Sequence, residues 1–236
     1  DTPKPQVDWE PKALESEIDQ ILQEAAKYLV KVPLRSDVTS VWAGLRPLAR
    51  TDEKSYEQGA TQNVSREHTV KVAANGMVSV MGGKWTTYRA MAADVMQSIR
   101  NAQLISLTSE DATLDTKLWG APSFEPTKVM QKDGASVSDS PYGTDAELLA
   151  SLPGADSGLG PLTSRQLSEA MVRFAARYEY ARTVEDVLAR RNRLLFLDAN
   201  AALAVAPQVA DILGAETGVS PQLAAFEALA KSYLMP

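Results

Sequence analysis

The chain has 236 residues, of which 44% are hydrophobic and 23% are charged, and its formal net charge is −6. This composition is typical of a globular protein with one large or two ordinary domains, and the acidic balance argues against nucleic acid as a partner. The lack of cysteine excludes disulfides and thiolate metal sites, and a single histidine excludes a histidine-based metal cluster. No apolar run approaches the roughly 18 to 20 residues that a bilayer-spanning helix needs.

The first predicted element is an amphipathic helix over residues 13–30, which Pro33 closes. Its apolar stripe consists of Leu14, Ile18, Ile21, Leu22, Ala25 and Leu29. The next run, Val41–Leu48, is strand-like and carries a single arginine, Arg46. Pro47 directly follows that arginine and favours extended geometry before it. We expect the polar segment 51–63 to be a surface loop.

A β-hairpin is predicted next, because residues 65–72 alternate in polarity and lead through Asn75-Gly76 into the apolar run 77–81. Arg66 lies near the start of this alternating segment. If the hairpin and the run around Arg46 share one sheet, Arg46 and Arg66 could converge on one dianionic group, for which the guanidinium fork is suited. The alternative for each arginine is a solvated or ion-paired side chain.

The most informative stretch follows the second hairpin strand. Gly82 and Gly83 are followed by Lys84 and then by helical spacing from Tyr88 to about Arg100. A strand, a glycine turn and a helix start direct unpaired N–H groups to one point, which favours an anion or a carbonyl oxygen carrying negative charge. Lys84 adds a full positive charge. The alternative is a tight connection in which the glycines serve only packing.

Residues 101–142 contain few apolar repeats, and we place a domain boundary near Gly120. After Tyr142 the whole chain has helical spacing. The first two predicted helices cover 144–152 and the apolar stripe 167–178. The third begins at a Thr183-x-x-Asp186 capping box, and the fourth runs from Asp198 to Ala210. Pro207 should kink or split the fourth of these, and Ser220-Pro221 should open the last helix. The predicted fold class is therefore α+β followed by all-α, with domains 1–118 and 119–236.

Five segments, in the same order and spacing, resemble the FAD-dependent glycerol-3-phosphate dehydrogenases. They are Val41–Leu48, Ser65–His68, Gly82–Arg89, Ala181–Arg191 and Arg193–Asp198. Such enzymes begin with a dinucleotide-binding unit, and no G-x-G-x-x-G occurs in this sequence. The resemblance implies an incomplete, C-terminal half of the enzyme. Residues 1–118 would be the C-terminal portion of the FAD- and substrate-binding region, and residues 119–236 a C-terminal helical domain.

The resemblance also implies a reaction, in which sn-glycerol 3-phosphate is oxidised to dihydroxyacetone phosphate by hydride transfer to FAD and a membrane quinone takes the electrons. Arg46, Arg66 and Lys84 would bind the substrate, and Arg46 and Lys84 would be catalytic. The residues implied in FAD binding are Gly82, Gly83, Lys84, Trp85 and Thr86. No residue of the chain is a convincing general base. His68 is the only imidazole, and a packed or surface position is the alternative to a direct role.

Other interpretations stay open at this point. An oxidase that passes electrons to oxygen would have the same motifs, and residues 142–236 alone could form a non-catalytic helical interaction module. The resemblance implies two partners, the missing N-terminal half of the same protein and the membrane quinone, and leaves a homodimer open. It also implies that the protein binds peripherally to the cytoplasmic side of the inner membrane. The cluster Arg190-Arg191-x-Arg193 could contact a membrane or partner, or pair with Glu185, Asp186 and Asp198.

Overall fold

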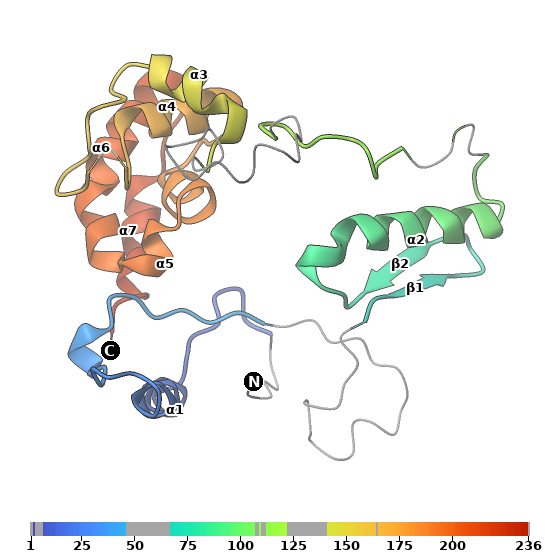
Figure 1. The fold of residues 1–236 in the computed structure, drawn as a ribbon, viewed down its shortest axis with the longest axis horizontal. Coiled ribbons are helices and arrows are strands. Elements are labelled where there is room, and N and C mark those ends of the chain that lie inside the picture. Colours follow the sequence, from blue (N-terminus) through green and yellow to red (C-terminus); the bar gives the residue numbers. More distant parts are fainter. Residues whose placement is uncertain are drawn as a thin grey trace, which may run out of the picture. The chain divides into compact units, whose positions relative to one another are not determined.

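The computed structural model describes residues 2, 7–45, 67–106, 109, 112–121, 141–163 and 165–235. Contacts divide the chain into two compact units (Figure 1). Unit 1 consists of Asp1–Pro11 and Gly44–Lys117, and unit 2 consists of Lys12–Ala43 and Leu118–Pro236. Unit 2 is therefore assembled from two separate stretches of the sequence.

Unit 1 contains the predicted hairpin. Strands β1 (Thr69–Val72) and β2 (Val78–Met81) pair antiparallel, with Thr69 opposite Met81. The turn closes through a hydrogen bond of 2.9 Å from the Ala73 N–H to the Met77 carbonyl, and Gly76 adopts the positive φ of 83° that this turn requires. A short 3-10 helix, η4 (Trp85–Thr87), and helix α2 (Tyr88–Asn101) follow. The predicted α+β start of the chain is confirmed.

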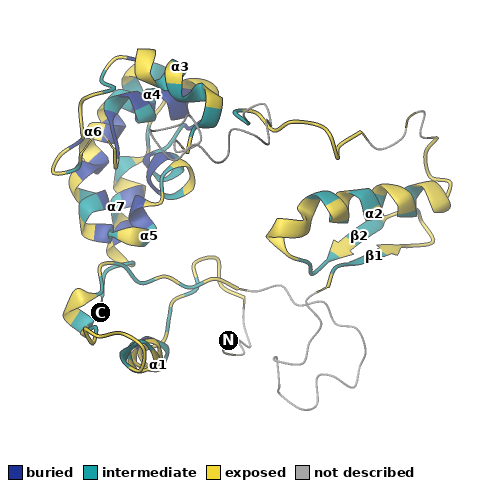
Figure 2. Cartoon of the chain, in the orientation of Figure 1, coloured by how far each residue is buried: buried dark blue, intermediate teal, exposed yellow. Residues whose placement is uncertain are grey.

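None of the described residues of unit 1 is buried (Figure 2). In its described part, one helix and two strands of four residues each supply too little apolar surface to close a core. Apolar side chains consequently stay open, including Met77, which is 60% exposed, and Trp85, which is 87% exposed.

Unit 2 begins with helix α1 (Glu15–Ala26), followed by a 3-10 turn, η1 (Arg35–Asp37). The helix is shorter than the predicted range 13–30. Its start is fixed because the Glu17 carboxylate accepts a hydrogen bond of 2.8 Å from the Leu14 N–H. Of the predicted apolar stripe only Ile18 is buried, whereas Ile21 is 69% exposed.

The predicted strand over Val41–Leu48 is wrong for residues 41–45, which form no strand; residues 46–48 lie outside the described residues. We call Thr39–Trp42 the clamp, because its polar groups bind helix ends of the same unit. The hydroxyls of Thr39 and Ser40 donate to the carbonyls of Leu197 and Leu195, at 2.6 and 2.8 Å. The Val41 N–H donates to the Tyr233 carbonyl at 2.8 Å. The Trp42 ring packs edge-on against Phe196, with centroids 5.3 Å apart.

The rest of unit 2 is helical, which confirms the predicted all-α second part. Its elements are η6 (Gly143–Asp145), α3 (Ala146–Ser151), α4 (Glu169–Tyr178), the π-helix η7 (Asp186–Arg191), α5 (Leu194–Leu197), α6 (Ala199–Thr217) and α7 (Leu223–Lys231). Helix α6 packs against α4 and α7, and the buried residues gather where these helices face one another (Figure 2). The largest apolar side chains that are fully buried are Leu167, Val172, Val184, Val187, Leu188, Leu195, Val205, Val209, Leu213 and Phe226.

Two predicted helix starts are confirmed by their hydrogen bonds. The Thr183 hydroxyl accepts from the Asp186 N–H at 3.1 Å while the Asp186 carboxylate accepts from the Thr183 N–H at 3.0 Å, which is a reciprocal capping box. The carboxylate of Asp198 accepts from the Ala201 N–H at 2.9 Å and caps α6.

Two other predicted helix limits are wrong. Helix α6 runs through Pro207 to Thr217 instead of ending at Ala210, because burial of the alanine- and valine-rich segment on both sides of the proline offsets the missing hydrogen bond. The last helix does not open at Ser220-Pro221. The Pro221 carbonyl accepts from the Val184 N–H at 2.9 Å, and Gln222, with φ of 56°, precedes the first helical residue.

Candidate functional site

The strand–glycine–helix segment at Gly82–Thr87 holds five of the seven predicted site residues. Strand β2 ends at Met81, and the chain then turns through Gly82 and Gly83, whose φ angles are 73° and 95°. Lys84 is extended and leads into η4. The two remaining predicted residues, Arg46 and Arg66, lie outside the described residues, so their convergence stays a prediction.

Gly83 is required by the packing of unit 1. A Cβ at this position would lie 2.5 Å from the Met91 Cε on α2 and 3.2 Å from the His68 Cβ beside β1. A side chain here would force the flexible end of Met91 to move, and the positive φ is itself unfavourable for any residue with a side chain. The glycine therefore lets α2 fold back over the hairpin.

The start of the helical segment carries open N–H groups. Trp85 and Thr86 are the first two residues of η4, so no intrahelical carbonyl accepts their N–H groups. No side chain of the described part caps η4 or α2. The Thr87 hydroxyl is already used, because it donates to the Lys84 carbonyl at 3.0 Å. The positive end of this helix thus remains available to an acceptor oxygen.

Among the described residues, His68 has a carboxylate partner and Lys84 has none. Lys84 forms no ion pair with any residue that the structure describes. The Nε2 of His68 lies 2.7 Å from the Asp94 carboxylate on α2, and the histidine side chain is 23% exposed. That contact links the hairpin to the helix, which agrees with the packed position considered for His68.

The arginine cluster of unit 2 is mostly engaged within the unit. Arg190 lies 2.6 Å from Glu185 and 3.1 Å from Asp186, and Arg191 bonds the main-chain carbonyl of Glu179. The Arg182 and Thr183 N–H groups also bind the Asp186 carboxylate and, with the Arg190 charge, lower its pKa against the effect of burial. Arg193 forms no ion pair among the described residues. Of the predicted partners, Glu185 and Asp186 are paired, whereas Asp198 forms no ion pair with any of the three arginines and caps α6 instead.

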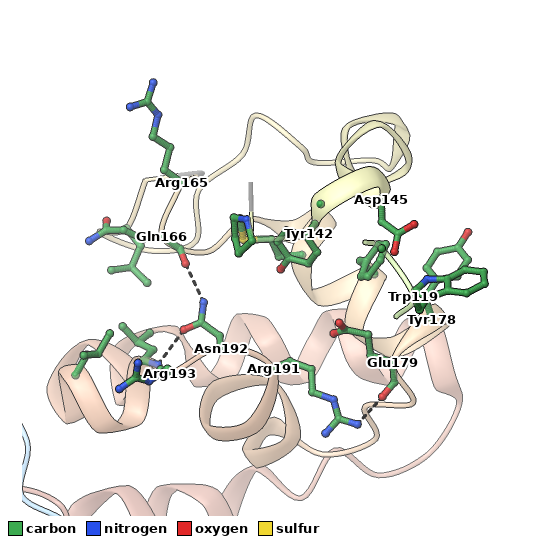
Figure 3. Close-up of a pocket in the computed structure, with 18 of the residues that line it drawn as sticks. Trp119, Tyr142, Asp145, Arg165, Gln166, Tyr178, Glu179, Arg191, Asn192 and Arg193 are labelled. Carbon is green, nitrogen blue, oxygen red and sulfur yellow. Dashed lines mark hydrogen bonds between the residues drawn. The ribbon is translucent and has the colours of Figure 1, made fainter. Parts of the chain in front are cut away.

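Unit 2 also contains a cavity of about 900 Å³ that the sequence did not reveal (Figure 3). Its lining comes from the loop 118–121 and from η6, α4, η7 and α5. Burial and the charge of Glu179 raise the pKa of Tyr142 to about 12. Burial also raises the pKa of Glu179, against the effect of Arg191, and the charge of Asp145 raises it further.

Two kinds of site find no support in the described part of the chain. There, no group of three or more histidine or acidic residues is placed to hold a metal ion. No helix in it has the length and apolar character to cross a membrane.

Replacing Gly83 with alanine is expected to lower the stability of unit 1 by about 1–3 kcal/mol, because the new Cβ meets Met91 and the backbone needs a positive φ. Hydrogen exchange of the β2 and α2 amides measures the loss. Gly44→Ala is the matched control, since nothing lies within 4 Å of its added Cβ. Equal exchange in the two variants would show that the turn tolerates a side chain.

Comparison with known proteins identifies the family. The family described as the C-terminal domain of alpha-glycerophosphate oxidase matches residues 77–224. The chain is 32% identical over 230 residues to glycerol-3-phosphate dehydrogenase SDP6, mitochondrial, of Arabidopsis thaliana, which covers 87% of this chain and 36% of that protein. It is 33% identical over 233 residues to the mitochondrial glycerol-3-phosphate dehydrogenase of Homo sapiens, covering 92% of this chain and 31% of the relative.

A third relative, the probable mitochondrial glycerol-3-phosphate dehydrogenase of Caenorhabditis elegans, is 34% identical over 226 residues, with 89% of this chain and 31% of the relative covered. The chain thus spans about a third of the length of these curated relatives. The family match includes β2, the glycine turn, α2 and most of the helical unit. The chain belongs to the glycerol-3-phosphate oxidase and dehydrogenase family, of which it carries the C-terminal domain.

Proposed function

We propose that the chain supplies the C-terminal part of a flavoenzyme that oxidises sn-glycerol 3-phosphate to dihydroxyacetone phosphate. The observation that supports this most is the turn at Gly82-Gly83, which joins a strand to a helix start that no described side chain caps, beside Lys84, which forms no ion pair with a described residue. Relatives along nearly the whole chain are named for activity on glycerol 3-phosphate. In this proposal residues 1–118 belong to the region that binds FAD and substrate, and residues 119–236 form the C-terminal helical domain.

The segment 82–86 fits the flavin of FAD. When bound, FAD would supply a hydride acceptor, and its ring would gain negative charge that a helix N-terminus can stabilise. The N–H groups of Trp85 and Thr86 are open to an acceptor oxygen there, and the Lys84 ammonium is free of ion pairs within the described residues. Gly82 and Gly83 place backbone without side chains at the same turn.

Arg46, Arg66 and Lys84 are the residues that we propose for substrate binding. Two guanidinium forks would give the substrate phosphate paired, orienting hydrogen bonds, which a point charge cannot. Lys84 would bring positive charge to the reacting end of the substrate. Arg46 and Lys84 would act as catalytic residues by orienting the substrate C2 hydrogen for transfer.

We propose a membrane quinone as the electron acceptor, with peripheral binding of the enzyme at the cytoplasmic face of the inner membrane. Oxygen is the second candidate acceptor, because the matching family is described by an alpha-glycerophosphate oxidase. The partner required in either case is an N-terminal part that contains a dinucleotide-binding unit.

Reconstitution tests the proposal. The 236-residue chain is co-expressed with the part of the human relative that this chain does not match, and the complex is purified through a tag on the chain. We expect flavin absorbance to co-purify and to bleach on anaerobic addition of glycerol 3-phosphate but not of glycerol. Lys84→Met should slow this bleaching by about 100-fold, whereas Lys71→Met, on the exposed edge of β1, should not.

Two results would contradict the proposal: a complex without flavin, or equal bleaching in the Lys84 and Lys71 variants. Reoxidation then identifies the acceptor. Rapid reaction with a quinone analogue without hydrogen peroxide supports the dehydrogenase, and rapid peroxide formation in air supports the oxidase.

A further inference from the structure

One end of the cavity in unit 2 is walled by aromatic rings. Tyr142 meets Phe174 edge-on, with centroids 5.2 Å apart, and the rings of Phe174 and Tyr178 are tilted by 41°, with centroids 5.1 Å apart. Trp119 lines the same cavity and is 88% exposed. The view in Figure 3 places Trp119 and Tyr178 together at the end where Asp145 lies. Ring faces of this kind attract positive charge.

Three carboxylates line the cavity; that of Asp198 caps α6, whereas those of Asp145 and Glu179 form no ion pair with a described residue. Asp145 comes from η6 and Glu179 directly follows the last residue of α4. Burial raises the pKa of Glu179, the nearby Arg191 charge lowers it, and repulsion from Asp145 raises it further, so the net direction is that of a carboxylate whose negative charge is only partly compensated.

Several polar groups on the opposite wall are engaged within the unit, whereas Arg165 and Arg193, which also line the cavity, form no ion pair with a described residue. Arg191 binds the main-chain carbonyl of Glu179 and lies 3.8 Å from Asp186, and its charge partly offsets that of the Glu179 carboxylate, whose pKa it lowers. The Asn192 side chain donates to the Gln166 carbonyl at 2.9 Å and accepts from the Leu194 N–H at 2.9 Å. This wall is the end of the π-helix, where the Asn192 N–H reaches back five residues to the Val187 carbonyl at 2.7 Å. Isolated π turns are frequent at functional sites.

We propose that the aromatic end of this cavity binds an organic cation, an alkylammonium group held between the ring faces and the carboxylates of Asp145 and Glu179. The carboxylates supply the counter-charge, and the rings supply cation–π attraction and exclude water. A free quaternary amine and a lysine side chain share this chemistry. The site is separate from the glycine turn of unit 1, and the inference does not depend on the proposed function.

Titration of the 236-residue chain with tetramethylammonium chloride tests the inference, with sodium chloride as the reference at equal ionic strength. Isothermal calorimetry reports binding, and the difference in tryptophan fluorescence between the parent and a Trp119→Phe variant reports the environment of Trp119, one of four tryptophans in the chain. We expect saturable binding that Glu179→Gln and Asp145→Asn each weaken by about tenfold. Glu147→Gln is the matched control, because this exposed glutamate lies on the neighbouring helix α3 and does not line the cavity.

A second probe, n-butylammonium, distinguishes the two sources of the cation. Tighter binding of tetramethylammonium assigns a quaternary amine, and tighter binding of n-butylammonium assigns a lysine-like group. Circular dichroism confirms that each variant is folded, and Tyr178→Leu replaces any carboxylate variant that is not. The inference is overturned if no probe binds saturably, if the carboxylate variants bind like the parent, or if inorganic phosphate binds instead.

Discussion

Phe226→Ala is expected to lower the free energy of unfolding of the helical unit by about 3–5 kcal/mol. The Phe226 side chain is 1% exposed and belongs to the core formed where α7 packs against α6. Truncation removes most of a large apolar side chain and leaves a cavity that the surrounding helices, with their small alanine and valine residues, cannot fill. Urea denaturation followed by far-UV circular dichroism measures the change.

Val219→Ala serves as the matched control for this measurement. Val219 lies just before α7 and is 47% exposed, so its truncation should change stability by less than about 0.5 kcal/mol. A small effect of Phe226→Ala, comparable to that of the control, would mean that α7 does not complete the core.

The second large loss of stability is expected on substitution of Glu216. This residue lies on α6, and its carboxylate binds two arginines of α4. Arg173 donates to its carboxylate at 2.6 Å, and Arg177 donates at 2.7 and 2.8 Å. The Glu216 side chain is only 10% exposed. Glu216→Gln should therefore destabilise unit 2 by about 2–4 kcal/mol, less than for a fully buried pair because Arg177 is 41% exposed.

The pH dependence of stability gives a second measurement at the same site. The hydrogen bond from Arg177, followed by that from Arg173, lowers the pKa of Glu216 below its ordinary value of 4.5, although burial opposes this. Its contribution is fully present above pH 4.5 and is lost as the pH falls through the lower pKa of the folded state. Glu216→Gln should remove this acid-induced loss. Asp211→Asn, exposed on the same helix, should retain it.

Local signals in the sequence predicted several elements correctly because the groups that determine them are close in the chain. The hairpin depends on the turn at Gly76, and the capping box depends on Thr183 and Asp186, three residues apart. The turn at Gly82-Gly83 and the helix after it could also be predicted, because positive φ angles favour glycine and helix starts have their own residue preferences.

The errors concern groups that are distant in sequence. Residues 41–45 have the composition of a strand, but the N–H of Val41 binds the carbonyl of Tyr233, and no pattern within the segment could reveal that acceptor. Pro207 normally ends or kinks a helix, and only tertiary burial on both sides allows α6 to continue. The cavity was missed for the same reason, because its rings come from positions as far apart as Trp119 and Tyr178.

The clamp has a consequence for chain connectivity. Since Lys12–Ala43 and Leu118–Pro236 form one unit, residues 44–117 are a long excursion that leaves this unit and returns to it. The entropy of closing such an excursion grows only with the logarithm of its length, by about 0.6 kcal/mol for each doubling. Insertions or deletions within the excursion should therefore leave the helical unit almost unaffected. Loss of the clamp contacts would instead release the N-terminal arm from the ends of α5 and α7 and leave it attached to the helical unit only through the excursion.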